Sequence, residues 1–479
     1  MKMVKSLLLG SAAGLFAVAG AQAADLPVKA KAVEYVKVCS LYGAGFYYIP
    51  GTDTCIKLGG FLRVDIGHNQ AGSLATYTSG ADAQYDRGTN THRTRTRAAL
   101  SADVRTQTEY GTLRSYLRGG WQWSTNDTIT SNNNITYFDR GFIQFAGFTF
   151  GKTESFFDFY PVPVYSFQTQ AFEGSSGGVG INVYAYTAQF GNGVSATLSF
   201  EDQSFRSLSV VDLSQGVPFT YNAANATDRT GQDVLDIVAN IRVDQAWGSA
   251  QIMGALHENA ARYYAANQNL GHPDSEWGWA AGAGITLKMP WDARDTLSLQ
   301  GVYCEGAAGY CVNPGRAATA GTSGWSGLAF GWKQDAGTIG GAWADDAYFN
   351  TGTSLELSQA FSLAGAFQHY WTPSLRTSIY AQYANYEANS TQVDTVICAA
   401  RALSAGCADW SAYQIGSRTL WNPVANLDVG VDIMYTHLDS ALIGSSQLDN
   451  PNGGTPALRP FADGDVWSGL LRVQRNFWP

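Results

Sequence analysis

Three arginines at alternate positions are the most distinctive chemical feature of the chain. Residues 91–105 read T-H-R-T-R-T-R-A-A-L-S-A-D-V-R, so Arg93, Arg95 and Arg97 are separated by single threonines. Residues two apart on a β-strand share one face. The segment therefore predicts a strand with a wet, cationic face, which carries this arginine ladder, and a drier opposite face. A strand with water on one side and lipid on the other has this pattern.

Three further arginines extend the cationic face. Arg114, Arg118 and Arg140 lie on the next alternating segments, and we expect them to line adjacent strands of the same wall as the arginine ladder. Closely spaced cations repel one another, so a stabilising role would require paired carboxylates. Two interpretations stay open: a positive wall beside the narrowest part of a channel, or a lumen lining neutralised by salt bridges.

The chain contains no recognisable catalytic or metal-binding set of residues. Its six histidines are scattered, and none lies within five residues of a cysteine. The glycine-rich stretch 174–180 lacks the helix that would make it a phosphate-binding loop. A formal charge of −9 argues against binding to nucleic acid. We therefore expect no enzymatic activity, no cofactor and no metal.

Strand-like segments recur along most of the chain, separated by turns and polar loops. Short turns such as 191–193 and 246–248 alternate with long polar stretches such as 207–231 and 438–464. Eighteen segments are candidates: 56–67, 92–106, 109–123, 135–146, 148–156, 181–190, 194–206, 232–245, 249–261, 276–289, 295–304, 323–334, 338–346, 354–370, 375–387, 411–421, 424–437 and 465–477.

The two faces of these segments differ in polarity. In 375–387, Leu375 and Ile379 share one face, whereas Arg376 and Gln382 share the other. Charged side chains at mid-strand would be costly in a filled core, but a water-filled lumen accommodates them. The pattern therefore predicts an all-β transmembrane antiparallel barrel. A soluble β-sandwich or propeller, whose strands also alternate, is the alternative.

Composition and the first residues support export to an outer membrane. Charged residues make up 14% of the chain and aromatic residues 13%, whereas a typical soluble domain has about 25% charged residues. Residues 1–23 have a basic start, an apolar stretch over 7–18 and an A-x-A site at Ala21–Ala23, which together predict a cleaved signal peptide. We expect an N-terminal segment, 24–55, and a barrel domain, 56–479.

Six cysteines in an exported chain predict disulfide bonds. Six cysteines allow fifteen connectivities, and pairing neighbours in sequence gives the shortest loops. The expected pairs are Cys39–Cys55, Cys304–Cys311 and Cys398–Cys407.

Several stretches resemble the alphaproteobacterial, rhizobial-type general porins. The stretch Val33–Arg63, V-E-Y-V-K-V-C-S-L-Y-G-A-G-F-Y-Y-I-P-G-T-D-T-C-I-K-L-G-G-F-L-R, is similar to their N-terminal signature. R-T-R-T-R at 93–97, W-T-P-S-L-R-T-S at 371–378 and R-V-Q-R-N-F at 472–477 extend the resemblance. The last strand ends on Phe477, which resembles the signal read by the barrel-assembly machinery, although two residues follow it.

The resemblance implies a homotrimeric outer-membrane barrel of a Gram-negative bacterium. It implies sixteen strands, passive diffusion of ions and small hydrophilic solutes, and contact with outer-membrane lipid and lipopolysaccharide. We therefore expect two of the eighteen segments, around 338–354, to merge or vanish, and keep eighteen strands as the alternative.

The resemblance also implies an external loop folded into the lumen as a constriction. The aromatic segment at about 157–180 is the candidate, because its aromatic side chains need a surface to pack on. Glu154, Asp158 and Glu173 would supply carboxylates opposite the arginines. Such an arrangement creates a transverse field that orients dipolar solutes.

Three other functions are alternatives to passive diffusion. A substrate-selective, sugar-type channel would require a row of lumenal aromatic residues. An outer-membrane enzyme would require a convergent catalytic set, and an adhesin would require a large external domain. None of these features is recognisable in the sequence, so these functions are the alternatives.

Overall fold

The computed structural model describes most of the chain. The described residues are 37–69, 90–125, 132–168, 172–176, 180–215, 228–312, 328–332, 340–398, 408–440, 445–448, 457–460 and 463–477. The chain divides into two units, 1–38 and 39–479, and the second contains the strands described here. The predicted signal peptide, 1–23, lies outside the described residues. In the described part of the chain, no helix is long and apolar enough to cross a lipid bilayer.

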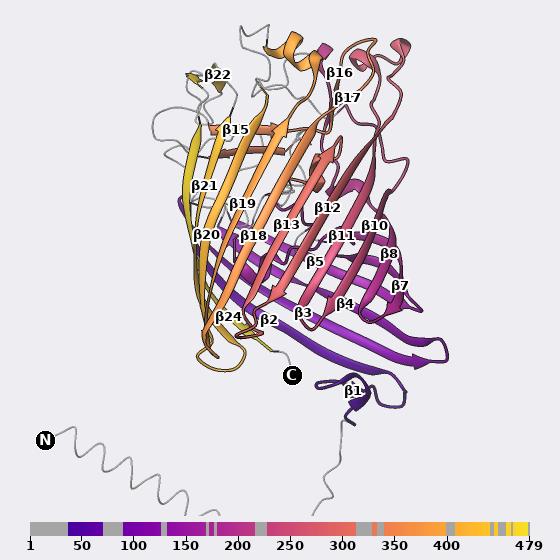
Figure 1. The fold of residues 1–479 in the computed structure, drawn as a ribbon, viewed down its shortest axis with the longest axis vertical. Coiled ribbons are helices and arrows are strands. Elements are labelled where there is room, and N and C mark those ends of the chain that lie inside the picture. The colour runs from indigo at the N-terminus through magenta and orange to yellow at the C-terminus, as the bar shows by residue number, and fades with distance from the viewer. Residues whose placement is uncertain are drawn as a thin grey trace, which may run out of the picture. The chain divides into compact units, whose positions relative to one another are not determined.

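Sixteen antiparallel strands close into a barrel (Figure 1). Each strand pairs with the next one around the wall, and β24 pairs with β2 to close the ring, with Arg472 opposite Asp65. The wall strands are β2 (Cys55–His68), β3 (His92–Thr108), β4 (Gly111–Thr125), β5 (Asn132–Phe145), β6 (Phe148–Thr153), β7 (Ile181–Gly191), β8 (Val194–Glu201), β10 (Asp236–Gln245), β11 (Gly248–Asn259), β12 (Glu276–Lys288), β13 (Thr296–Glu305), β18 (Gln359–Thr372), β19 (Leu375–Glu387), β20 (Trp410–Trp421), β21 (Leu427–Ser440) and β24 (Gly464–Asn476).

The remaining elements are short; the first two precede β2, and the others lie in the connections between wall strands. They are η1 (Ser40–Tyr42), β1 (Tyr47–Tyr48), α2 (Val162–Tyr165), η2 (Gln203–Phe205), β9 (Val210–Asp212), η3 (Leu213–Gln215), η4 (Tyr264–Ala266), η5 (Gln268–Leu270), η6 (Ala308–Tyr310), β14 (Leu328–Trp332), β15 (Gly340–Ala344), β16 (Ala347–Phe349), β17 (Glu356–Leu357), η7 (Val393–Cys398), β22 (Ser445–Leu448) and β23 (Ala457–Pro460).

The expected count of sixteen strands is confirmed, and the alternative of eighteen is wrong. The two surplus segments, 323–334 and 338–346, contain β14 and β15, which pair with each other in a separate two-stranded sheet. They cannot enter the wall, because β13 pairs directly with β18 from Thr296 to Glu305. Alternation alone does not reveal whether a strand finds its partner in the wall or in a loop.

The predicted polarity of the two faces is confirmed in the wall strands. On β19, Ile379 is 59% exposed on the outer face, whereas the neighbouring Ser378 and Tyr380 are buried inside. Trp121 on β4 and Leu363 on β18 also lie exposed on the outer face. An apolar outer face on a closed ring of strands is what a lipid environment requires.

Connection lengths alternate between the two ends of the barrel. The short turns, such as the one between β7 and β8, lie at the lower end of Figure 1, and the loop strands β15, β16, β17 and β22 lie at the upper end. Asn192 and Gly193 both have positive φ values, 49° and 73°, as the tight turns of twisted hairpins require. Two long connections, 202–235 and 306–358, carry half of these short elements.

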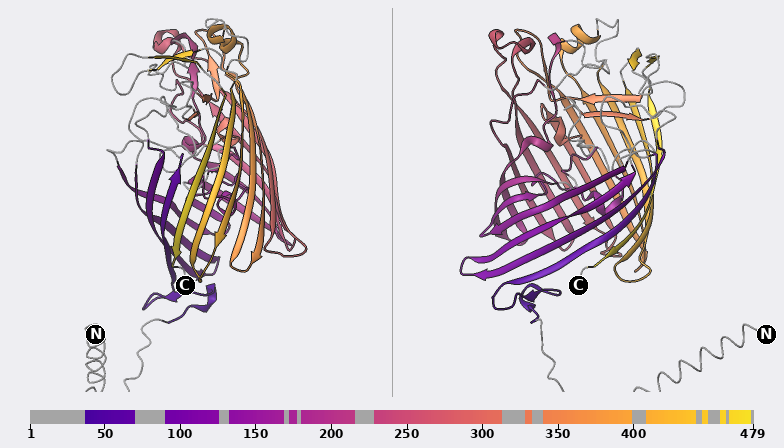
Figure 2. Two further views of the ribbon diagram at one scale, coloured as in Figure 1. Left: turned by 90° about the vertical axis from the view of Figure 1, so that its left-hand side faces the viewer. Right: turned by 180° about the vertical axis from the view of Figure 1, so that it is seen from behind.

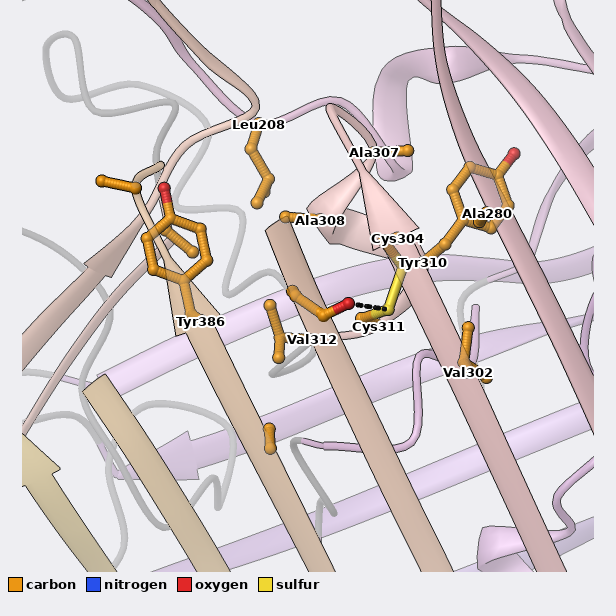
Figure 3. Close-up of a cluster of buried hydrophobic side chains, with 14 of the residues drawn as sticks. Leu208, Ala280, Val302, Cys304, Ala307, Ala308, Tyr310, Cys311, Val312 and Tyr386 are labelled. Atoms are coloured by element: carbon orange, nitrogen blue, oxygen red, sulfur yellow. Dashed lines mark hydrogen bonds between the residues drawn. A yellow bond between two sulfur atoms is a disulfide. The ribbon is translucent and has the colours of Figure 1, made fainter. Parts of the chain in front are cut away.

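An apolar core fills part of the barrel interior (Figure 3). Inward side chains of the eight consecutive wall strands from β10 to β21 contribute to it, including Val238, Met253, Val302, Tyr386 and Trp410. Leu208 and Tyr310, from the two long connections, pack against them. The inner face is therefore not uniformly polar, because folded-in connections cover an apolar stretch of β10–β21.

One buried carboxylate joins the two long connections. Asp346 accepts hydrogen bonds from the backbone of Leu208 at 2.6 Å and of Ala308 at 2.9 Å. It also forms a 2.8 Å ion pair with Arg229. Segment β9 of the first connection pairs in parallel with β16 of the second, with Val210 opposite Ala347. The infolded material is thus cross-linked by backbone and side-chain contacts.

Two of the expected disulfides are confirmed. Cys39–Cys55 anchors the N-terminal segment to the start of β2, and Cys304–Cys311 closes the end of β13 against η6 (Figure 3). Cys398 is also disulfide-bonded, but its predicted partner Cys407 lies outside the described residues.

Candidate pore constriction

The connection between β6 and β7 folds into the barrel and follows its inner wall. Of its residues 154–180, the structure describes 154–168, 172–176 and 180. The Phe156 carbonyl accepts a 2.6 Å hydrogen bond from Asn240 of β10. Farther along, the Tyr160 amide donates to Gln300 of β13 at 3.0 Å. The loop thus passes from the strands next to its origin toward the far side of the ring.

The tip of the loop reaches the seam of the barrel. The Ser166 hydroxyl and the Phe167 amide donate to Asp432 of β21 at 2.8 and 2.5 Å. The Phe167 ring lies 4.9 Å from the guanidinium of Arg418 and 4.4 Å from that of Arg472. Asp432 thus accepts two hydrogen bonds from the loop, and the Phe167 ring makes two cation–π interactions. Together these contacts fix the loop tip on β20, β21 and β24.

The returning part of the loop is held to the same side. The Phe172 amide donates to Gln382 of β19 at 3.0 Å, and the Glu173 carbonyl accepts from Gln300 at 2.7 Å. Near its two ends the loop also approaches β5, where Glu154 and Gly180 lie close to Arg140. The loop therefore covers the β10–β24 side and leaves the arginine-bearing side facing it.

Local sequence explains why the loop fits. Pro161 precedes the single turn α2 and Pro163 lies within it; neither has an amide donor, so fewer backbone groups need partners. Tyr160 and Tyr165 are buried against small and apolar wall residues. A Cβ atom at Gly430 would lie 2.7 Å from the Phe167 ring, so glycine makes room for the loop tip. The prediction that the loop's aromatic residues pack on the inner wall is confirmed.

A buried arginine clamps the loop to the long connections. Arg206, which follows η2, pairs with Asp158 at 2.5 Å and donates to the carbonyls of Gly174 and Gly309. Its guanidinium also lies 4.5 Å from the Tyr310 ring. Sequence reasoning missed Arg206, because a lone arginine in a loop carries no periodic signal.

The predicted arginines lie on the inner face of neighbouring strands, as expected from alternation. Most are paired with carboxylates: Arg95 with Asp65 at 2.7 Å, Arg114 with Asp103 at 2.9 Å, Arg118 with Asp139 at 3.2 Å and Arg140 with Glu154 at 2.6 Å. Arg93 is 1% exposed, and Arg97 is half-buried. These four arginines therefore form salt bridges along the wall, as the second of the two interpretations predicts.

Asp65 joins arginines from two neighbouring strands. It is completely buried and binds Arg95 of β3 and Arg472 of β24, the second at 2.6 Å. Arg63, Arg418 and Arg472 were not among the predicted wall residues. Each is a single arginine on the polar face of its strand. Its position on that face was the one sequence signal that could have predicted an inward side chain.

The carboxylates predicted on the loop do not share one environment. Glu154 is exposed and pairs with Arg140, whereas the side chains of Asp158 and Glu173 are buried. Burial raises the pKa of Asp158, although Arg206 and Ser176 oppose the shift. Burial also raises the pKa of Glu173 well above its ordinary value. Asp158 thus faces Arg206 in the packing, and an acidic wall opposite the arginine ladder stays a prediction.

The family is decided by a match to the porin subfamily that covers residues 25–470. The chain belongs to this porin subfamily. Over 216 residues the porin is 34% identical to porin Omp2a of Brucella ovis, an alignment that covers 41% of this chain and 59% of the relative. Over 271 residues it is 31% identical to porin Omp2b of Brucella suis, covering 51% and 64%. The chain thus spans about three-fifths of these relatives.

Solved structures support the fold of this porin. The outer membrane channel DcaP of Acinetobacter baumannii superimposes with a TM-score of 0.60 at 14% identity, covering 90% of this chain and 99% of that one. At that identity the likeness concerns the fold alone. Family membership and a closed barrel together place the protein among the outer-membrane β-barrels.

Proposed function

We propose that this porin forms a passive, water-filled channel for ions and small hydrophilic solutes across the outer membrane. The observation that carries the proposal is the constriction loop, which lines one side of a closed barrel and faces charged side chains on the other. Charged inner walls favour hydrated solutes and penalise apolar ones. Arg93, Arg95, Arg97, Arg114, Arg118 and Arg140 form the basic wall in this proposal, with Glu154, Asp158 and Glu173 as its acidic counterpart.

Three features of assembly are part of the same proposal. Residues 1–23 are a signal peptide removed on export, and the mature barrel forms a homotrimer surrounded by lipid and lipopolysaccharide. Phe477 serves the barrel-assembly machinery as a terminal signal. Its amide donates to the Gly60 carbonyl at 3.0 Å, and its ring occupies the space that a side chain at Gly60 would need, which supports a role at the closing seam.

Single-channel recording in planar lipid bilayers tests the proposal. We expect stepwise currents that rise linearly with voltage and salt, closing in three steps if three pores act together. Protein that is folded and inserted but gives no current would contradict the channel. A saturable block of the current by an oligosaccharide would instead favour the sugar-selective alternative.

A further inference from the structure

Two arginines lie side by side on the inner wall without a carboxylate partner. Arg63 of β2 and Arg97 of β3 are directly opposed in the sheet, and both are half-buried. Directly opposed residues on one face have Cβ atoms about 5 Å apart. Neither side chain forms an ion pair within the described part of the chain.

Neutral groups hold both guanidiniums in place. The Nε atom of Arg63 donates to Gln474 at 2.6 Å, and that of Arg97 donates to Gln122 at 2.7 Å. The Arg63 guanidinium lies 4.6 Å from the Phe61 ring, and that of Arg97 lies 4.5 Å from the Tyr137 ring. A hydrogen bond at Nε and an aromatic ring fix each group while the terminal nitrogens keep their charge and donors.

The nearest carboxylates already serve other arginines. Asp65 binds Arg95 and Arg472, and Asp139 binds Arg118. Among the described residues, the buried Nε2 of Gln122 has no hydrogen-bond partner. Gln122 is 3% exposed, so a buried donor next to Arg97 awaits an acceptor. An unpaired buried donor is costly, and the two like charges repel each other.

We propose that Arg63 and Arg97, with Gln122, form a weak binding site for small oxyanions inside the pore. The planar guanidinium matches the geometry of carboxylate and phosphate oxygens. An oxyanion would relieve the repulsion between the two arginines and accept from Gln122. Both arginines are only partly buried, so the anion can exchange with the lumen, as conduction requires.

This inference rests on the proposed channel function and deepens it. It assigns a preferred solute class, small oxyanions, to a channel whose acidic overall charge would otherwise favour cations. The charge that matters is local, because exposed charges farther away than about 10 Å are largely screened by salt.

The test compares wild-type channels with an Arg63→Gln/Arg97→Gln variant in planar bilayers. Inorganic phosphate, added at constant ionic strength, is the probe. For the wild type we expect a saturable reduction of the chloride current by phosphate. In the variant we expect the apparent affinity to fall about tenfold or more, the loss expected for a charge-assisted hydrogen bond. The reversal potential in a KCl gradient should shift toward cations.

A matched control removes two charges elsewhere. Arg262→Gln/Arg294→Gln alters two arginines in connections at the ends of the barrel; Arg262 is exposed, and the Arg294 side chain is 48% exposed. We expect this control to keep the phosphate block. Equal block in all three proteins would overturn the oxyanion site and leave the channel intact, whereas absence of current in the wild type would overturn both.

An arginine-to-lysine variant covers the case in which the glutamine variant does not fold. Arg63→Lys/Arg97→Lys keeps both charges but removes the planar guanidiniums and their Nε donors. We expect ion selectivity near that of the wild type together with a weaker phosphate block. An unchanged phosphate block in this variant would contradict recognition by the paired guanidiniums.

Discussion

At the residue scale, the environment of each arginine decides its role. Arg95 and Arg472 are both buried and share the carboxylate of Asp65. Arg105 and Arg114 share Asp103 in the same way, but their side chains are 27% exposed. Removing one partner from a fully buried charge cluster leaves uncompensated charge, whereas pairs with more access to water contribute less. The cluster of Asp65, Arg95 and Arg472 therefore contributes to folding stability more than to ion selectivity.

We predict that Asp65→Asn lowers the free energy of unfolding by about 3 kcal/mol, because two buried arginines lose their shared carboxylate. Asp103→Asn is the matched control, with an expected loss of about 1 kcal/mol or less. Denaturant titration of the barrel in detergent, followed by its heat-modifiable electrophoretic mobility, measures both. Equal losses in the two variants would contradict a special role for Asp65.

At the element scale, the folded-in connection 306–358 depends on a buried carboxyl group. Asp345 lies between β15 and β16, and its Oδ2 atom accepts from the Tyr348 hydroxyl at 2.9 Å. Burial and the neighbouring Asp346 raise the pKa of Asp345 to about 7, against the hydrogen bond from Tyr348. A carboxyl whose pKa is raised on folding favours the folded state when it is protonated.

We predict that this connection is most stable in acid. Its contribution is complete below the ordinary aspartate pKa, near 4, and is lost as the pH rises through 7, a change on the order of a few kcal/mol. Hydrogen exchange of residues 340–358, corrected for the intrinsic rate, should therefore be slower at pH 5 than at pH 8. Asp345→Asn should remove most of this difference, and a variant that retains it would refute the assignment to Asp345.

At the scale of the whole molecule, ring closure leaves an apolar surface facing outward and no free edge strand in the wall. Ile379 lies near the middle of β19 and is 59% exposed on that surface. Lipid removes the cost of this exposure, because the outer face has apolar surroundings. The same face cannot accept a charge without cost.

We predict that Ile379→Arg destabilises the barrel in lipid vesicles by about 2–4 kcal/mol, as arginine does near the bilayer midplane. Tyr110→Arg is the control, because Tyr110 is 70% exposed in the short turn between β3 and β4 and can reach water. Urea titration of vesicle-inserted protein compares them. A large loss for Tyr110→Arg, or none for Ile379→Arg, would contradict a lipid-facing position for β19.

Alternation in the sequence was sufficient to predict the faces of the wall and the inward position of Arg93, Arg95 and Arg97. Period-two patterns depend on the local backbone, so they survive without knowledge of partners. The same pattern also produced two surplus strands, 323–334 and 338–346, since β14 and β15 alternate without joining the wall.

The sequence by itself was enough to predict a barrel with arginines on its inner face and an aromatic loop that packs inside it. The tertiary structure decided which charges meet. Asp65 and Arg472 are 407 residues apart, and ring closure brings them together at the seam. Register likewise placed Arg63 opposite Arg97 while their neighbours took the carboxylates. Pairing between distant strands depends on register and closure, which no local pattern encodes.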